Sequence, residues 1–160
     1  MPLKKPALDP MTVTPRTSTG YPEPYRSRVL PREKRGLGDA LGLKTIGINQ
    51  TVLAPGTESS MRHWHTHEEE FVYVLSGEVV LRTDDGEQLL TPGMCAGFPA
   101  SPDGKTGDGH QLINRGSVPA VYLEVSNRDE RDQAFYTDVD LHFHGDAAPT
   151  RFTRKDGSAF

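Results

Sequence analysis

MRHWHTHEEEFVYVLSGE, residues 61–78, places three alternating histidines and three glutamates directly before a run of β-branched and aromatic residues. Half of the six histidines in this 160-residue chain lie in this stretch. Residues 70–75 are typical of a strand, and both alternating sets of side chains in 71–75 are apolar, which favours a strand covered on both faces. Ionisable groups beside such a strand are costly unless they are paired or bound to a cation.

Short strand-like runs separated by turns continue on both sides of this stretch. Gly and Asp punctuate them, as in Asp84-Asp85-Gly86, which is typical of a hairpin turn. This spacing predicts an all-β sandwich or barrel of antiparallel strands. The predicted strands are 43–54, 70–75, 78–83, 87–91, 94–98, 110–114 and 118–126, with a Pro/Gly loop at 99–109.

Two extensions flank the predicted barrel. Seven of the thirteen prolines lie in residues 2–31, which indicates an extended N-terminal arm because proline fixes φ and lacks a donor. We therefore divide the chain into an arm (1–42), a barrel (43–126) and a polar C-terminal extension (127–160) that packs on the barrel through aromatic anchors. The arm is suited to an edge or to embracing a second subunit.

Composition narrows the partners and the compartment. The net charge of −4, with acidic and basic residues interspersed, gives no basic footprint for nucleic acid. No stretch is apolar enough to span a membrane, and the N-terminus does not have the composition of a signal peptide. Cys95 is the single cysteine, so an internal disulfide is excluded, and we expect a buried, inert thiol. These features predict a cytoplasmic protein with neither nucleic-acid nor membrane partners.

Alternation in a strand puts His63 and His65 on one face, with Cα atoms about 6.5–7 Å apart. A short connection would return the chain into the next strand, with Glu70 at its start beside both imidazoles. Imidazole and carboxylate ligands together suit Fe, Mn, Ni, Cu, Co or Zn. The alternative is a surface patch of histidines, and this is the interpretation we favour for His142 and His144, which lack a nearby glutamate on an apolar strand.

The spacing His63-x-His65-(x4)-Glu70-(x6)-Gly77 resembles the first motif of the cupin superfamily, and TPGMCAGFPA followed by His110-(x3)-Asn114 resembles the second. The sequence around these motifs is similar to that of small single-domain bacterial cupins, some of which are named as sugar-phosphate isomerases. The resemblance implies an antiparallel jelly-roll barrel with a divalent transition metal held by His63, His65, Glu70 and His110. It also implies a homodimer paired through the outer sheet.

The chain departs from the family pattern in one respect. The loop SPDGKTGDG places His110 further from the second-motif proline than is usual, so His110 is matched through its spacing to Asn114. His67 and Glu69 remain rival ligands. Glu70 is preferred over Glu69 because it shares strand parity with Val72 and Val74 and has the family spacing to Gly77.

Four further residues have candidate roles. Asn114 is interpreted as fixing the turn after its strand. Phe98 and Tyr122 would either line a substrate pocket or pack in the core. Glu124 interrupts an apolar run, so it would be a pocket base, a partner of a ligand histidine or a solvent-facing residue.

A metal with open positions can polarise a carbonyl or activate water. The favoured hypothesis is a metal-dependent isomerase acting on a small sugar-like or carboxylate substrate, with Glu70 or Glu124 moving a proton. The alternatives are a dioxygenase or lyase, or a small-molecule-binding or sensor domain without turnover. A metal-free barrel is the third hypothesis.

Overall fold

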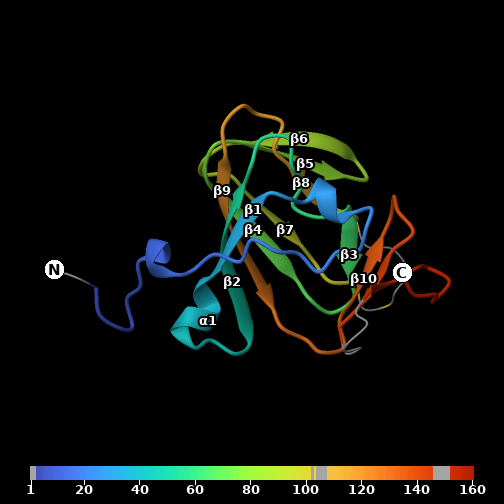
Figure 1. The fold of residues 1–160 in the computed structure, drawn as a ribbon, viewed down its shortest axis with the longest axis horizontal. Coiled ribbons are helices and arrows are strands. Elements are labelled where there is room, and N and C mark those ends of the chain that lie inside the picture. The colour runs from blue at the N-terminus through green and yellow to red at the C-terminus, as the bar shows by residue number, and fades with distance from the viewer. Residues whose placement is uncertain (1–2, 102, 104–107, 146–151) are drawn as a thin grey trace.

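The computed structural model describes residues 3–101, 103, 108–145 and 152–160, and they form an antiparallel β-fold with short helices (Figure 1). Every strand pair is antiparallel, which confirms the all-β prediction. The strands are β1 (Arg32–Gly36), β2 (Ile46–Leu53), β3 (His63–His65), β4 (Glu70–Ser76), β5 (Val79–Thr83), β6 (Gly86–Leu90), β7 (Cys95–Phe98), β8 (Gln111–Ile113), β9 (Ala120–Asn127), β10 (Gln133–Tyr136), β11 (His142–His144) and β12 (Phe152–Thr153). The helices are η1 (Pro10–Thr12), η2 (Arg26–Arg28) and α1 (Leu37–Leu41).

The strands of the described residues form three sheets. The largest has the order β1-β2-β9-β4-β7, a second has the order β6-β5-β8, and the third has the order β12-β11-β10-β3. In Figure 1 the β5, β6 and β8 strands lie at the top, and β3 and β10 lie at the side nearest the C-terminus. Residues 102 and 104–107 of the predicted 99–109 loop lie outside the described residues.

Two separate apolar clusters hold these sheets together. The first lies between the five-stranded and three-stranded sheets and includes Val74, Leu81 and Tyr122 from β4, β5 and β9. The second joins Tyr21 of the N-terminal arm to Met61, Tyr136 and Leu141. The arm and the C-terminal extension therefore share one core, to which Tyr21 and Tyr136 also contribute a hydroxyl–hydroxyl hydrogen bond of 3.1 Å.

Side chains alternate along β4 between an inner and an outer face of the sheet. Val72 and Val74 are buried in the first cluster, whereas Phe71, Tyr73 and Leu75 are 41%, 38% and 40% exposed. The prediction that both faces of this strand are covered is wrong for the single chain. Its outward side chains are apolar, and no other part of the described chain lies over them enough to bury them.

The flanking segments contain more regular structure than the sequence indicated. Residues expected in an extended arm form β1, which pairs with all but the start of β2, and α1, which ends at Gly42 in the left-handed conformation (φ 80°). The C-terminal extension, expected as a polar tail, contributes β10, which pairs with β3. Charged β1 (REKRG) has no apolar alternation, so local patterning could not reveal that it is an edge strand. The three-part division of the chain remains a prediction.

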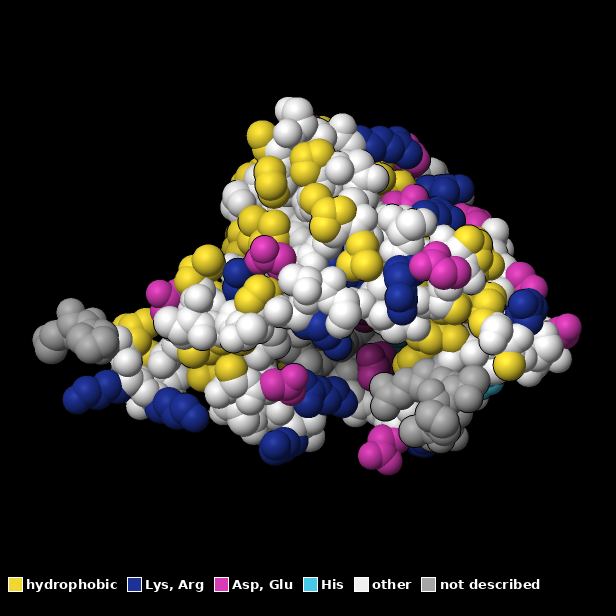
Figure 2. Space-filling view, viewed as in Figure 1, with side chains coloured by type: hydrophobic (Ala, Val, Ile, Leu, Met, Phe, Trp, Pro, Cys, Tyr) yellow, Lys and Arg dark blue, Asp and Glu magenta, His cyan; other side chains and the backbone are white. Residues whose placement is uncertain are grey.

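The surface carries both signs of charge. On the face shown in Figure 2, Lys and Arg side chains are interspersed with Asp and Glu, and very little histidine surface is visible.

Cys95 is exposed, so the prediction of a buried thiol is wrong. It lies opposite Tyr73 in the pairing of β7 with β4, on the outer face of the sheet. Among the described residues, no helix has the length and apolar character needed to cross a bilayer.

Candidate metal centre

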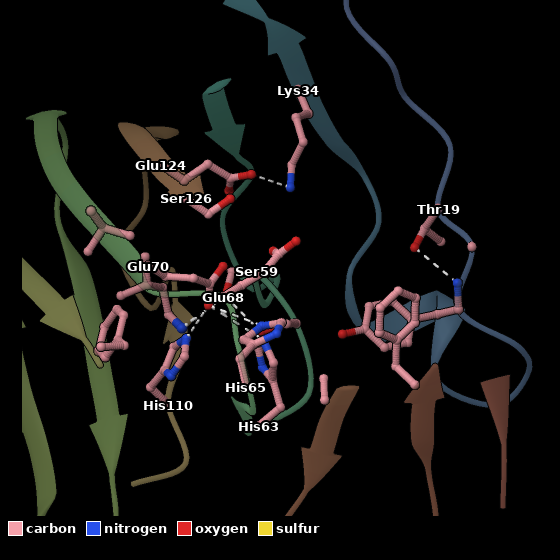
Figure 3. A pocket seen from close by; sticks show the side chains of 18 of the residues that line it. Thr19, Lys34, Ser59, His63, His65, Glu68, Glu70, His110, Glu124 and Ser126 are labelled. Carbon is pink, nitrogen blue, oxygen red and sulfur yellow. Dashed lines mark hydrogen bonds and ion pairs between the residues drawn. The ribbon is translucent and has the colours of Figure 1, made fainter. Parts of the chain in front are cut away.

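Two strands, β3 and β4, and one bridging residue bring four candidate ligands together (Figure 3). His63 and His65 lie at the two ends of β3, and Glu70 begins β4. His110 precedes β8 and forms an antiparallel bridge with His63, with backbone N–O distances of 2.8 and 3.1 Å. The long loop before His110 therefore does not displace it, because the bridge fixes it directly opposite His63.

Glu70 Oε2 lies at the centre of this cluster. It is 2.8 Å from His110 Nε2, 3.4 Å from His65 Nε2 and 3.8 Å from His63 Nε2. The ligand atoms of His63, Glu70 and His110 all lie within 4.8 Å of one another. This is a separation that a single cation could bridge with small side-chain movements, given ligand bonds of about 2.0–2.2 Å.

Hydrogen bonds at Nδ1 orient two of the imidazoles. His63 Nδ1 lies 2.9 Å from the Met61 carbonyl oxygen, so it must donate, which leaves Nε2 with its lone pair toward Glu70. His65 Nδ1 lies 2.6 Å from Asp132 Oδ2 and is held in the same way. His110 is oriented instead by Phe98, whose ring stacks on it at 3.7 Å and 5°, while its Nδ1 is buried without a hydrogen-bond partner among the described residues.

The donor set fits a divalent transition metal. Imidazole nitrogens and a carboxylate oxygen converge from different elements, and carboxylate or carbonyl partners at Nδ1 are the usual support for ligating histidines. Without a cation, the lone pair on Nε2 of the buried His63 would face the Glu70 carboxylate 3.8 Å away.

Burial and neighbouring charges polarise the cluster. Burial, together with electrostatic interactions with the neighbouring imidazoles of His110 and His65, lowers the pKa of His63 to about 3. Burial would also lower the pKa of His65, but Glu70 and Asp132 outweigh it and raise the pKa to about 10. Burial opposes ionisation of Glu70, yet His65 and His110 hold its pKa well below the usual range. In the metal-free chain at neutral pH, His65 is thus a positively charged imidazolium and Glu70 is a negatively charged carboxylate.

The cluster forms part of the wall of a cavity of about 460 Å³. Phe98 and Tyr122 both line it, although Tyr122 is also fully buried in the first core cluster. Glu124 lines it as well, and in Figure 3 it lies above Glu70, paired with Lys34. Its carboxylate also accepts hydrogen bonds from Asn49 Nδ2 (3.1 Å) and Thr51 Oγ1 (3.2 Å). Glu124 is therefore a cavity residue rather than a solvent-facing one.

The carboxylate bonded to His65 is Asp132, whereas the contacts of Glu124 described above go to Lys34, Asn49 and Thr51 rather than to a ligand histidine. Asp132 Oδ1 also accepts the backbone N–H groups of His67 (2.9 Å) and Glu68 (3.1 Å), which fixes the connection between β3 and β4. Asp132 lies 67 positions after His65, in the polar segment that follows the predicted barrel, so nothing in the local sequence pointed to it.

Sequence reasoning also missed other residues of the cavity. Glu68 lines it, and burial raises the pKa of its carboxyl. Tyr136 lines it and stacks on His63 at 5.4 Å. Tyr21 of the arm lines the cavity as well. The arm was expected to pack at an edge or on a second subunit, but its proline-rich pattern did not single out Tyr21.

The remaining candidates lie outside the cluster. His67 Nδ1 contacts Thr66 Oγ1 at 2.8 Å, and Glu69 is exposed, with its backbone N–H bonded to Asn127. His142 and His144 are half-buried and contact Gln133 and Thr153, and among the described residues neither belongs to a group of potential metal ligands.

Asn114 fixes its turn as predicted. Its side-chain amide donates to the carbonyls of Leu53 (2.8 Å) and Val118 (2.9 Å) and accepts the Gly116 N–H (2.9 Å).

Comparison with known proteins agrees with this geometry. Residues 49–126 match the model of the cupin domain family. The chain is 39% identical to a sugar phosphate isomerase of the cupin superfamily from Silicibacter pomeroyi, whose crystal structure superposes with a TM-score of 0.87 over 97% of this chain and 96% of that one. The chain belongs to the cupin superfamily. The resemblance found in the sequence is thereby confirmed, and with it the jelly-roll barrel.

Two further relatives of this cupin are more distant. A crystal structure from Acidithiobacillus ferrooxidans is 34% identical, with a TM-score of 0.64 over 69% of this chain and 68% of that one. The tetracenomycin polyketide synthase protein TcmJ of Streptomyces glaucescens is 31% identical over 113 residues, 70% of this cupin and 71% of that protein. Relatives of similar identity thus carry names from different chemistries, so the family alone does not fix a reaction.

Proposed function

We propose that this cupin is a metal-dependent isomerase that acts on a small, sugar-like substrate or on a related carboxylate. The observation that carries the proposal is the convergence of His63, His65, His110 and Glu70 on the wall of a cavity. The naming of the Silicibacter pomeroyi relative, which matches nearly the whole chain, supports isomerase over the alternatives. The protein would act in the cytoplasm as a homodimer.

The four ligand residues would hold the cation, and the bound ion would polarise the carbonyl oxygen of the substrate. Isomerisation of a hydroxycarbonyl then requires that one proton leave the carbon beside the carbonyl and that one proton be added to the former carbonyl carbon. Glu124 is the carboxylate outside the ligand set that we assign to this transfer, because Lys34, Asn49 and Thr51 hold it in place on the cavity wall. Phe98 and Tyr122 would exclude water from the reacting carbons.

The first test is the metal content of protein purified without a tag, for which we expect about one transition-metal ion per chain. Glu70→Gln should abolish retention of the metal. Glu124→Gln should keep the metal and lose exchange of the substrate carbon-bound proton with deuterium from solvent. Negligible metal in the native protein would overturn the proposal in favour of a metal-free barrel.

The same preparation separates the alternative functions. Substrate-dependent consumption of dioxygen by the iron-loaded protein would identify a dioxygenase instead. A tightly bound small molecule that is recovered unchanged after long incubation would identify a binding or sensor domain. An isomerase should do neither, and should equilibrate two isomers of one substrate.

A further inference from the structure

Three basic side chains line the cavity together with the ligand cluster. Arg32 and Lys34 alternate on β1 and so share its inner face, and Arg16 belongs to the N-terminal arm. The arm is held beside β1 by a two-way backbone bridge between Arg16 and Lys34, with N–O distances of 2.9 and 3.0 Å. An edge strand and an arm therefore complete the wall opposite the barrel strands that carry the candidate ligands.

These three charges are compensated unequally. Lys34 Nζ pairs with Glu124. Arg32 is half-buried, and its donors among the described residues contact two neutral oxygens, the Ser59 carbonyl and Thr19 Oγ1. Within the described part of the chain, no carboxylate lies within ion-pair distance of Arg16 or Arg32. Two guanidinium groups thus face the cavity without a counter-charge in that part of the chain.

The charge of the whole cavity leads to the same conclusion. Its lining contains three basic side chains, Arg16, Arg32 and Lys34, and three carboxylates, Glu68, Glu70 and Glu124. Because these balance, a divalent cation bound at the cluster would leave the cavity with two net positive charges. A guanidinium is planar and matches the geometry of phosphate and carboxylate oxygens, so the excess charge is placed on groups suited to oxyanions.

We propose that Arg16 and Arg32 form a subsite for a doubly negative oxyanion group of the substrate, either a phosphate monoester or a pair of carboxylates. The subsite would hold this group while the hydroxyl and carbonyl oxygens of the substrate reach the histidine–glutamate cluster. This inference rests on the proposed function, since it names the substrate class of the same cavity. It also gives the arm a role in recognition, because Arg16 lines the cavity while its backbone bridges Lys34 of β1.

The test compares matched neutral and charged probes by calorimetry on the full-length, metal-loaded protein. Glucose serves as the neutral probe, glucose 6-phosphate as the phosphate probe and glucarate as the dicarboxylate probe. We expect at least one charged probe to bind roughly tenfold or more tightly than glucose, and the tighter of the two identifies the oxyanion. Equal binding of all three, or no binding of either charged probe at millimolar concentration, would overturn the inference.

Four variants localise the effect. Arg16→Gln and Arg32→Gln should each weaken binding of the charged probe by roughly tenfold and leave glucose unaffected. Arg26→Gln is the matched control, because it removes the same charge from an exposed position of the arm that does not line the cavity. Arg32→Lys is the second variant at this position, for use if Arg32→Gln folds poorly because the Ser59 contact is lost. It keeps the positive charge and should retain most of the binding. Unchanged affinity in both glutamine variants would show that the probe binds the metal alone and would refute the subsite.

Metal content is measured in every sample, which keeps this inference separate from the proposed function. Absence of the metal in the wild-type protein would contradict the proposed function. Charged-probe binding that depends on Arg16 and Arg32 in metal-stripped protein would still support the subsite.

Discussion

Asp132 is the residue on which the orientation of His65 depends. The residue is 1% exposed, one carboxylate oxygen lies 2.6 Å from His65 Nδ1, and the other accepts two backbone N–H groups of the β3–β4 connection. A carboxylate at this place keeps a proton on Nδ1 and directs Nε2 toward the cluster, where a cation would replace the second proton that His65 carries in the metal-free chain. The direction of Nε2 therefore depends on a residue that does not itself reach the cluster centre.

Asp132→Asn should weaken metal binding by roughly 10- to 100-fold, because an amide can accept only through its oxygen and no longer fixes the imidazole by charge. The measurement is competition with a fluorescent chelator at fixed pH. Asp138→Asn is the control, since Asp138 pairs with Arg62 away from the cavity. Equal metal affinity of the Asp132 variant and the wild type would show that Asp132 does not orient His65 for metal binding.

At this scale the sequence predicted the residues that alternation and motif spacing connect. His63, His65 and Glu70 lie within eight residues, so strand geometry alone placed them side by side. His110 required the family resemblance, because its distance from the other three along the chain carries no geometric information. Asp132 and Arg16 could not be foreseen, since their roles arise only when the C-terminal extension and the arm pack against the barrel.

The β4–β5 connection shows how one backbone position shapes an element. Gly77 has φ of 68°, and a Cβ at this residue would lie 2.6 Å from the Pro119 carbonyl oxygen and 2.8 Å from the Ala120 Cα. The turn therefore needs glycine for two reasons, a left-handed conformation and close approach of the β9 backbone. The glycine that ends the first family motif is thus explained by packing between β4 and β9.

Gly77→Ala should lower the free energy of unfolding by about 3 kcal/mol or more, since backbone strain and a clash with immobile backbone act together. Gly56→Ala is the matched control, because Gly56 has a similar φ of 78° and open space around its Cβ position. It should cost only about 1 kcal/mol. Urea denaturation of both variants gives the comparison, and equal costs would show that strain alone matters at Gly77.

Elements with alternating apolar residues were predicted within a few residues, as for β4, β5 and β9. The missed elements are those stabilised by pairing rather than by their own pattern. β10 (QAFY) pairs with β3 and contributes Ala134 and Tyr136 to the second core, yet the polar residues around it gave no strand signal. In such segments tertiary contacts outweigh local propensity.

On the outer face of the five-stranded sheet, the burial predicted from the sequence differs most from the burial observed in the single chain. Phe71, Tyr73 and Leu75 alternate along β4, an interior strand of that sheet. On the adjacent β9, Val125 lies opposite Phe71 and Leu123 opposite Tyr73, so the apolar surface continues across two strands. A contiguous apolar face of this kind marks an interaction site in a water-soluble protein. The sequence pattern of a strand buried on both faces would then describe the assembly rather than the isolated chain.

A second copy of the chain is the occupant we expect for this face, because two identical apolar sheets can cover each other by a two-fold axis. Sedimentation velocity at micromolar concentration should therefore give a species of twice the 17.6 kDa chain mass. Leu75→Glu should convert it to the monomer, since each interface would bury two unpaired carboxylates at a cost of several kcal/mol. Leu89→Glu is the control: Leu89 is 53% exposed but lies on β6 in a different sheet, so this variant should remain dimeric. A wild-type protein that sediments only as a monomer would leave the outer face without its proposed partner, and dissociation by both variants would place the contact on another surface.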